Sequence, residues 1–455
     1  MDDRELRSWI ETTTGRTVRE VERMGYGASR ATFIVAMADG GDLVARVDTG
    51  DGPMAATELS LGREAEVYRA LAGTPVRIPA MHGVAPDGRV LLAERAPGTH
   101  VIDDLPEGER HAVLDDYIDA LADLHVVDAG SLELPAYRRP VDAPDQARQE
   151  LDLWGTILET RTTKPWPLAH YTRAVLHQCA PMTVARTVLC HGDVGPGNFL
   201  HDSGRVTALL DWEFSHLGDP MDDLGWWVFR GHDMAGGCGD LAAQLARWSA
   251  RTGLPVDSAS IEYYRAFVMF RWLVSVAATL DRGGSGIDRS VHFALVPILA
   301  VRLPQALATL VGATLPPPPA TPDDTPGQGA DVLAALAADL TEVILPGVES
   351  PEAQRRARAA LLYVSHLMAL DRLGPALAEA ELDDLAEVLG HRPVTAAEGQ
   401  AELAASVRDA VEGPDLARGD LLGYFWRAGH RQIALWPLAA PKALSPATAI
   451  PASRP

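Results

Sequence analysis

Two acids and one amide lie close together near the middle of the chain, on either side of a short apolar run. The segment HGDVGPGNFLHDSGRVTALLDWE, residues 191–213, places Asn198 five residues after Asp193, and Asp211 follows the run VTALL. A carboxylate can accept the proton of an attacking hydroxyl, and amide and carboxylate oxygens are ligands that Mg²⁺ accepts. These types and this spacing indicate transfer of a phosphoryl group to a hydroxyl, with Asp193 as the base and Asn198 and Asp211 as metal ligands.

Each of these residues, taken singly, could be an ordinary loop or turn residue. Taken together they match the spacing of a kinase catalytic loop, in which H-x-D is followed by Asn. We expect His191 to be structural, with its ring bonded to the loop backbone near Asp211. Asp219 and Asp223, in GDPMDDLGW, are expected to accept backbone N–H groups and brace the loop.

A β-rich segment near the N-terminus could cover the phosphates of a nucleotide. Residues 18–48 contain three short β-rich runs, and Asp39-Gly40-Gly41 between the last two is typical of a hairpin. The glycine-rich turn between the first two runs lets backbone N–H groups approach a phosphate, with candidate contacts at Gly27, Ala28 and Ser29. An ordinary hairpin turn explains this segment equally well when it is considered alone. No GxxxxGK[ST] motif occurs, which argues against a P-loop protein.

The remaining elements predict an α+β fold with a mainly helical second half. A helix over 59–73 and two strands within 76–98 complete a small antiparallel sheet lobe at 1–96. Helical periodicity from 106 onward, with short strands around 188 and 205, predicts a mainly helical catalytic lobe at 97–313. A Pro- and Gly-rich linker follows at 314–330, then an all-helical extension at 331–440 and a tail at 441–455 that we expect to be disordered.

Composition restricts the class of protein. The 40 basic and 62 acidic side chains give a formal net charge of −22, which argues against nucleic-acid binding. Three unevenly spaced cysteines suit neither a disulfide framework nor a zinc site and fit a cytoplasmic location. The acidic N-terminus lacks the features of a signal peptide, and no apolar run is expected to reach the length of a membrane span.

Longer motifs resemble one family. HGDVGPGN and DWEFSHLGDPMDDLGW are similar to the HGDxxxxN and DWE…GDP…DL motifs of the aminoglycoside phosphotransferase family, and the likeness extends over residues 20–310. GASRATF, REAEVYRALAG and RQELDLW resemble the branch of that family associated with acyl-CoA dehydrogenases. The resemblance implies a two-lobed protein-kinase-like fold, Mg²⁺, ATP or GTP as donor, and a small-molecule hydroxyl as acceptor.

The same resemblance assigns further residues to the nucleotide site. Glu64 matches the helix glutamate that pairs with a cation on the third strand, where Arg46 replaces the usual Lys. Arg is larger and forked, so this departure bears on the phosphate contact and on the pair with Glu64. The segment joining the lobes, with Glu94 and Ala96, would contact the nucleotide base.

The acceptor and the class of activity stay open at this point. The branch resemblance favours a hydroxyacyl-CoA-type acceptor, and the acidity favours a cationic antibiotic of the aminoglycoside type. Charged residues within 220–275 do not decide between them, because Asp222, Asp233 and Glu262 are mixed with arginines, among them Arg230 and Arg265. A pseudokinase-like scaffold without catalysis is the alternative from another class, and Arg46 favours it. The sequence does not indicate the oligomeric state.

Overall fold

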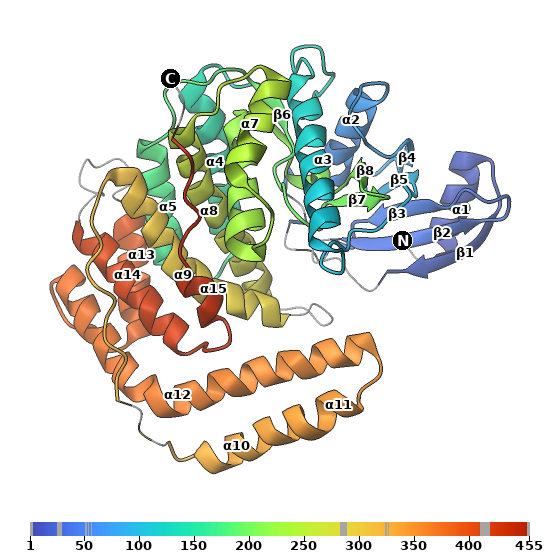
Figure 1. The fold of residues 1–455 in the computed structure, drawn as a ribbon. Helices are drawn as coiled ribbons and strands as arrows, with labels where there is room; N and C mark the ends of the chain where they lie inside the picture. Colours follow the sequence, from blue (N-terminus) through green and yellow to red (C-terminus); the bar gives the residue numbers. More distant parts are fainter. Residues whose placement is uncertain are drawn as a thin grey trace. The chain divides into compact units, whose positions relative to one another are not determined.

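The computed structural model describes residues 3–24, 30–50, 52, 54–55, 57–282, 289–323, 325, 327–409 and 419–452. The chain divides into two compact units. Figure 1 labels helices and strands of both units. The first contains Met1–Leu153, Ala180–Val268 and Thr448–Pro455, and the second contains Trp154–Cys179 and Met269–Ala447. Two helices, α4 (Ala143–Arg161) and α8 (Ser258–Arg282), contribute residues to both units.

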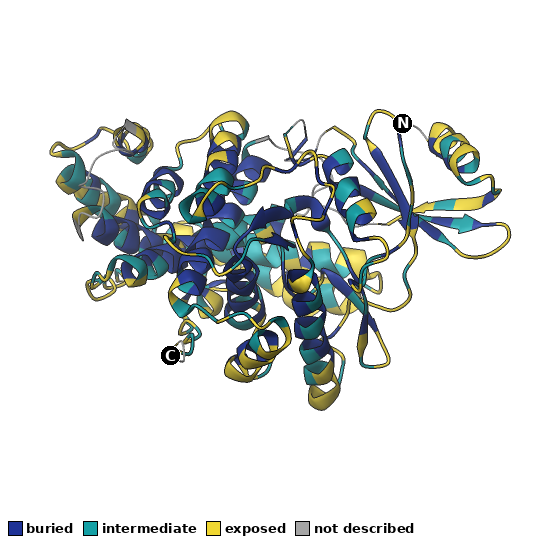
Figure 2. Cartoon of the chain, turned by 90° about the horizontal axis from the view of Figure 1, so that it is seen from above, coloured by how far each residue is buried: buried dark blue, intermediate teal, exposed yellow. Residues whose placement is uncertain are grey.

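A five-stranded antiparallel sheet forms the N-terminal part of the first unit, in the order β1-β2-β3-β5-β4. Its strands are β1 (Val18–Arg23), β2 (Ala31–Met37), β3 (Leu43–Val47), β4 (Met81–Val84) and β5 (Val90–Glu94), with helices α1 (Asp3–Thr14) and α2 (Leu61–Leu71). The predicted hairpin at Asp39-Gly40-Gly41 is confirmed, and both glycines have positive φ, of 82° and 68°. The exposed positions of α1 and of the edge strand β1 are yellow in Figure 2.

Strand periodicity decides where Arg46 points. Leu43, Ala45 and Val47 are buried on one face of β3, where Leu6 and Ile10 of α1 join the same hydrophobic core. Successive side chains of a strand leave opposite faces of the sheet, so Arg46 projects from the other face. Helix α2 begins at the N-cap Ser60, whose hydroxyl accepts from the backbone N–H of Arg63.

The rest of the first unit is mainly helical and contains two small antiparallel sheets. Strand β6 (Val188–Cys190) pairs with β9 (His216–Gly218), and β7 (Phe199–Asp202) pairs with β8 (Arg205–Leu209). The helices are α3 (Glu107–Val126), α6 (Pro220–Trp226), α7 (Leu241–Thr252), a 3₁₀ turn η1 (Trp212–Phe214) and a π-helix η2 (Trp227–Ala235). The short strands predicted around 188 and 205 are therefore confirmed.

Among the residues that the structure describes, the second unit contains helices and connecting segments and no strand. Besides the ends of α4 and α8, it contains α5 (Pro167–Gln178), α9 (Arg289–Val311), α10 (Ala330–Ala338), η3 (Asp339–Ile344), α11 (Leu345–Gly347), α12 (Pro351–Leu389), α13 (Ala396–Asp409), α14 (Gly419–Ala434) and α15 (Ala440–Leu444). Helices α9 and α14 approach closely at Gly429, where a Cβ atom would stand 2.2 Å from the carbonyl oxygen of Ala300. A residue with a side chain at this position would not fit.

This division differs from the boundaries expected from the sequence, which assigned all of 97–313 to the catalytic lobe. Residues 154–179 and 269–313 group with the later helices, because α5 packs on α13 and α9 packs on α14. Within the tail at 441–455, for which disorder is expected, the structure describes residues 441–452, and α15 extends into this segment. Thr448 donates its backbone N–H to Asp233 at 2.8 Å and accepts from Arg265 at 2.9 Å, which ties the tail to a buried ion pair.

Helix α9 corrects a further expectation, that no segment is apolar and long enough to span a membrane. By length and composition α9 passes that test, with a mean hydropathy of 1.7 over its most apolar window. Within that window 61% of the residues are buried inside the protein, as they are in core helices of soluble proteins.

Candidate active site

The loop that carries Asp193 is braced by one buried carboxylate. Asp223 accepts the backbone N–H groups of His191 at 2.7 Å and Gly192 at 2.8 Å, as expected from the sequence. It also accepts from His125 Nε2 at 2.9 Å, and Trp248 donates to the other ring nitrogen of His125 at 3.0 Å. Burial alone would raise the pKa of Asp223, but these donors outweigh burial and the pKa is lowered.

His191 links this loop to the segment before Asp211. Its Nε2 lies 2.8 Å from the carbonyl oxygen of Leu210, and its Nδ1 accepts the backbone N–H of Asp193 at 3.3 Å. Its ring also packs on Trp212, with the ring centroids 4.6 Å apart. These contacts agree with the structural role expected for His191.

The carboxylate of Asp193 is held at both oxygens. Asn198 donates its side-chain N–H to Oδ2 at 2.5 Å and to the main-chain oxygen of Asp193 at 2.8 Å. Arg230 donates Nη1 to Oδ1 at 2.6 Å and to the same main-chain oxygen at 3.2 Å. Asn198 and Asp193 therefore lie together as their spacing predicts, and Arg230 joins them.

Asp211 lies next to Asn198 through the backbone. The N–H of Leu210 donates to the carbonyl oxygen of Asn198 at 2.9 Å, so the two predicted metal ligands come from adjacent segments. Asp211 adopts a left-handed backbone conformation, with φ of 66°, which is uncommon for a residue other than glycine. Burial would raise its pKa, but the charge and hydrogen bond of Arg46 lower it.

Arg46 connects Asp211 to helix α2. Its Nη2 contacts Asp211 Oδ1 at 2.7 Å, and its Nη1 pairs with Glu64 Oε1. The pair that the resemblance implies between Glu64 and the strand cation is thus formed by an arginine here. Each terminal nitrogen of the fork reaches a different carboxylate, which lets one side chain contact both residues.

Arg30 and Glu213 lie near the pair of Arg46 and Glu64, and the sequence analysis assigned no role to either of them. Arg30 contacts the second oxygen of Glu64 at 2.8 Å and Glu213 at 3.2 Å, and all three side chains are buried. Burial and the charge of Asp211 raise the pKa of Glu213 to about 7. No motif spacing marks Arg30, although GASRATF contains it.

The predicted nucleotide-base segment lies at the end of the sheet. Strand register pairs Arg46 with Leu91 and Leu43 with Glu94, so Glu94 is at the end of the strand beside Arg46. Ala96 follows in the connection to α3, and the next residues are tied to β7 and β8 (Thr207 Oγ1 donates to the carbonyl of Pro97 at 2.6 Å). Gly27, Ala28 and Ser29 lie outside the residues that the structure describes.

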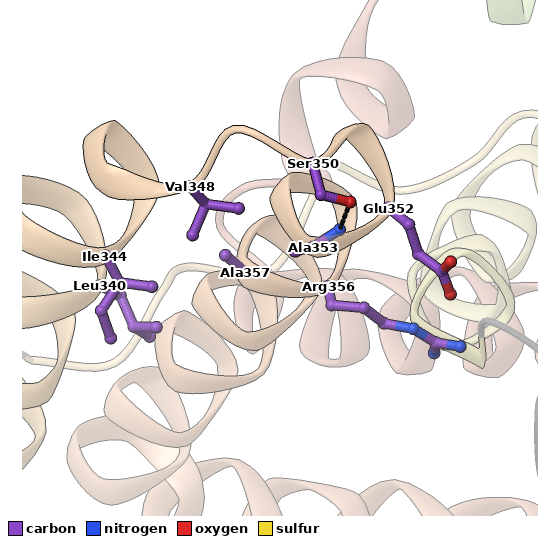
Figure 3. A pocket seen from close by; sticks show the side chains of 8 residues that line it. All are labelled: Leu340, Ile344, Val348, Ser350, Glu352, Ala353, Arg356 and Ala357. Carbon is purple, nitrogen blue, oxygen red and sulfur yellow. Dashed lines mark hydrogen bonds between the residues drawn. The ribbon is translucent and has the colours of Figure 1, made fainter.

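A separate hollow of about 520 Å³ lies in the second unit, between η3 and the start of α12 (Figure 3). Leu340, Ile344 and Val348 form an apolar side, and Ser350 at its rim caps α12 as predicted. None of the predicted site residues lines this hollow. The chemistry indicated by the sequence therefore concerns the first unit.

Comparison with known proteins now identifies the family. Residues 20–259, more than half of the chain, match the model of the phosphotransferase enzyme family. The chain belongs to this family. A protein from Ralstonia eutropha JMP134, named a putative aminoglycoside phosphotransferase, has a similar structure, with a TM-score of 0.52 and 24% identity, covering 69% of this chain and 99% of that chain. This likeness confirms the two-lobed kinase-like fold of the family.

Curated relatives confirm the expected branch. The probable acyl-CoA dehydrogenase IBR3 of Arabidopsis thaliana is 26% identical over 291 residues, covering 55% of this chain and 35% of that protein. Acyl-CoA dehydrogenase family member 11 of Gallus gallus is 30% identical over 221 residues, covering 45% and 27%. The matched part is thus about a third of the length of these relatives or less, and their dehydrogenase names apply to those longer proteins.

Proposed function

We propose that the chain is a kinase that transfers the γ-phosphoryl group of ATP or GTP to a hydroxyl group of a small molecule. The acceptor oxygen forms a bond to the γ-phosphorus while the bond from that phosphorus to the bridging oxygen of the nucleotide breaks. The electron pair of the broken bond leaves with the nucleoside diphosphate, and the proton of the hydroxyl passes to Asp193.

The observation that carries the proposal is the hydrogen-bonded connection from Asp193 through Asn198 to Asp211. Asn198 contacts Asp193 with its side chain and the residue before Asp211 with its main chain. A base and two metal ligands must lie within a few ångströms of one another for a single phosphoryl group to meet all three. This compact group supports phosphoryl transfer better than it supports a structural role for each residue separately.

The donor set is suited to Mg²⁺. The N–H donors of Asn198 point to Asp193, which leaves its carbonyl oxygen Oδ1 as a possible ligand. Asp211 uses Oδ1 for Arg46, and its Oδ2 could be the second ligand. Mg²⁺ binds few protein oxygens and keeps water and phosphate ligands, and when bound it neutralises charge on the nucleotide phosphates.

The proposal also assigns residues that would contact the phosphates and the base of the nucleotide. Arg46, held by Glu64, would contact the phosphates, and the turn with Gly27, Ala28 and Ser29 would lie over them. Glu94 and Ala96 would border the base. The ion pair of Arg46 with Glu64 corresponds to the cation–glutamate pair that an active kinase requires, which supports the kinase proposal over the non-catalytic scaffold.

The acceptor that we propose is a hydroxyacyl-CoA-type intermediate. The names of the curated relatives support it, because they connect this branch with acyl-CoA chemistry. The alternative is an antibiotic of the aminoglycoside type. We also propose a cytoplasmic location, which is consistent with three cysteines that are not disulfide-bonded.

A thermal-shift experiment combined with a transfer assay tests the reaction. MgATP or MgGTP should stabilise the full chain, and ATP should be consumed when hydroxylated acceptors are added. Asp193→Ala should lower transfer by at least about 10³-fold and retain nucleotide stabilisation, whereas Asp211→Ala should lose both. The control Asp202→Ala changes an exposed carboxylate of the β7–β8 hairpin and should resemble the wild type.

No stabilisation by either nucleotide, together with no transfer to any hydroxylated compound, would contradict the kinase proposal and favour the scaffold. Unchanged transfer in Asp193→Ala would contradict the role of Asp193 alone. The two results are therefore distinguishable.

A further inference from the structure

Arg230 occupies the position beside the proposed base. Its guanidinium contacts Asp193 Oδ1 at 2.6 Å, and the arginine side chain is 20% exposed. Both of its hydrogen bonds to Asp193 use Nη1. Among the residues that the structure describes, Nε and Nη2 have no acceptor, so they could bind another group.

The loop is shaped to admit this side chain. A Cβ atom at Gly195 would stand 2.6 Å from Cδ of Arg230, and the φ of Gly195 is +151°. Gly197 also lies beside the guanidinium, where a Cβ atom would be 3.5 Å from Nη2. Arg230 itself is on the π-helix η2, a conformation that is rare and frequent at functional sites.

The two oxygens of Asp193 face different surroundings. Asn198, the proposed metal ligand, holds Oδ2, so this oxygen lies on the side of the metal and the nucleotide. Arg230 holds Oδ1, the oxygen left to receive the proton of the acceptor. An entering hydroxyl must share or replace the contact of Arg230, which brings the guanidinium next to the acceptor.

Acids in the same part of the chain are already paired. Asp233, three residues after Arg230, contacts Arg265 at 2.6 Å, and Glu262 contacts the same arginine at 3.5 Å. Asp222 is buried and lies 3.1 Å from His216. The three acids that could have attracted a cationic acceptor are therefore engaged within the protein, whereas Arg230 presents unused donors.

We infer that Arg230 binds a negatively charged group of the acceptor, such as a carboxylate or a phosphate, close to the hydroxyl that is phosphorylated. The inference rests on the proposed kinase function and specifies the class of its acceptor. A forked guanidinium binds either anion through two parallel hydrogen bonds. A cationic acceptor such as an aminoglycoside would be repelled at this position.

The test uses the full chain and mixtures of small molecules separated by charge. A deproteinised cell extract is divided by ion exchange at neutral pH into anionic, neutral and cationic pools. Each pool is incubated with the protein and radiolabelled MgATP, and label transferred to small molecules is counted. The variants are Arg230→Gln, Arg230→Lys and, as a control of the same residue type, Arg205→Gln, which changes an exposed arginine in β8.

We expect label in products from the anionic pool. Arg230→Gln should reduce that transfer about 10- to 100-fold, the range expected for loss of a charge-assisted contact. Arg230→Lys should recover part of it, and Arg205→Gln should resemble the wild type. MgATP should stabilise all of these proteins equally in a thermal-shift assay, which shows that the variants fold and bind the donor.

Other outcomes would contradict either the role of Arg230 or the kinase function itself. Transfer that arises from the neutral or cationic pool, or anionic transfer that Arg230→Gln does not reduce, would overturn the inference and leave the kinase function in place. No transfer from any pool, with no stabilisation by MgATP or MgGTP, would overturn the kinase function itself.

Discussion

Glu64→Gln tests the charged group that connects the sheet lobe to the proposed metal site. The carboxylate of Glu64 has no exposed surface and contacts two arginines, Arg30 at 2.8 Å through one oxygen and Arg46 through the other. Glutamine keeps the size of the side chain but removes the charge. Its NH₂ group must also face one of the two guanidinium groups, donor against donor.

The expected loss in the free energy of unfolding depends on the contacts that Arg30 and Arg46 retain in the variant. Removing one partner of an isolated buried ion pair costs about 3–5 kcal/mol. Here Arg30 keeps the carbonyl of Leu59 at 2.6 Å and Glu213 at 3.2 Å, and Arg46 keeps Asp211 at 2.7 Å. We therefore expect a smaller loss in the free energy of unfolding, about 2–3 kcal/mol, which corresponds to a decrease of about 4–12 °C in Tm.

The assay is thermal unfolding of the full chain, with Glu20→Gln as the control because Glu20 is exposed on β1. The KM for MgATP should also rise about tenfold in Glu64→Gln, since Arg46 loses the contact that orients it. If Glu64→Gln unfolds within about 0.5 kcal/mol of the Glu20→Gln control, the buried pair does not stabilise the protein and the reasoning is refuted.

Three further predictions concern the loop before Asp193 and the second unit. Asp223→Asn should lower the free energy of unfolding by about 2–4 kcal/mol and lower kcat more than tenfold in steady-state assays, because an amide cannot accept every hydrogen bond that this carboxylate accepts. An unchanged kcat would contradict the bracing role. Gly192→Ala should lower Tm far more than Gly204→Ala in a thermal-shift comparison: both glycines have φ of +79°, but a Cβ atom would stand 2.1 Å from the carbonyl oxygen of Phe214 in the first and has open space in the second. Burial lowers the pKa of His170 to about 4, so the folded protein should lose stability as the pH falls from 6.5 toward 4, and His170→Gln should reduce the difference in Tm between pH 7.5 and pH 5. Equal pH dependence of the two proteins would exclude His170 as a contributor.

Local patterns explain most of what could be predicted. The hairpin at Asp39-Gly40-Gly41, the capping by Ser350 and the short strand after Ser203-Gly204 follow from backbone preferences of a few adjacent residues. The proximity of Asp193 and Asn198 also follows from sequence, because five residues of one loop cannot separate them far. Long motifs then identified the family, and the comparisons confirm it.

Contacts between distant residues explain what could not be predicted. Arg230 meets Asp193 across 37 positions, and Arg46 meets Asp211 across 165. The first of these contacts leaves only an indirect trace in the sequence, the glycines at 195 and 197 that make room for Arg230. Similarly, Asp233 and Arg265 bind the tail at Thr448, although its composition resembles that of a disordered segment.

The sequence by itself therefore indicated the type of reaction that we propose, since the proposed base and metal ligands lie in one short segment whose spacing restricts their geometry. The tertiary structure decided which charged residues contact that segment and which helices group with it. It brought Arg230 into contact with Asp193, joined Arg46 to both Glu64 and Asp211, and grouped 154–179 and 269–313 with the later helices. The physical reason is that hydrogen-bond and turn preferences act over a few residues, whereas ion pairing and packing depend on distance in space.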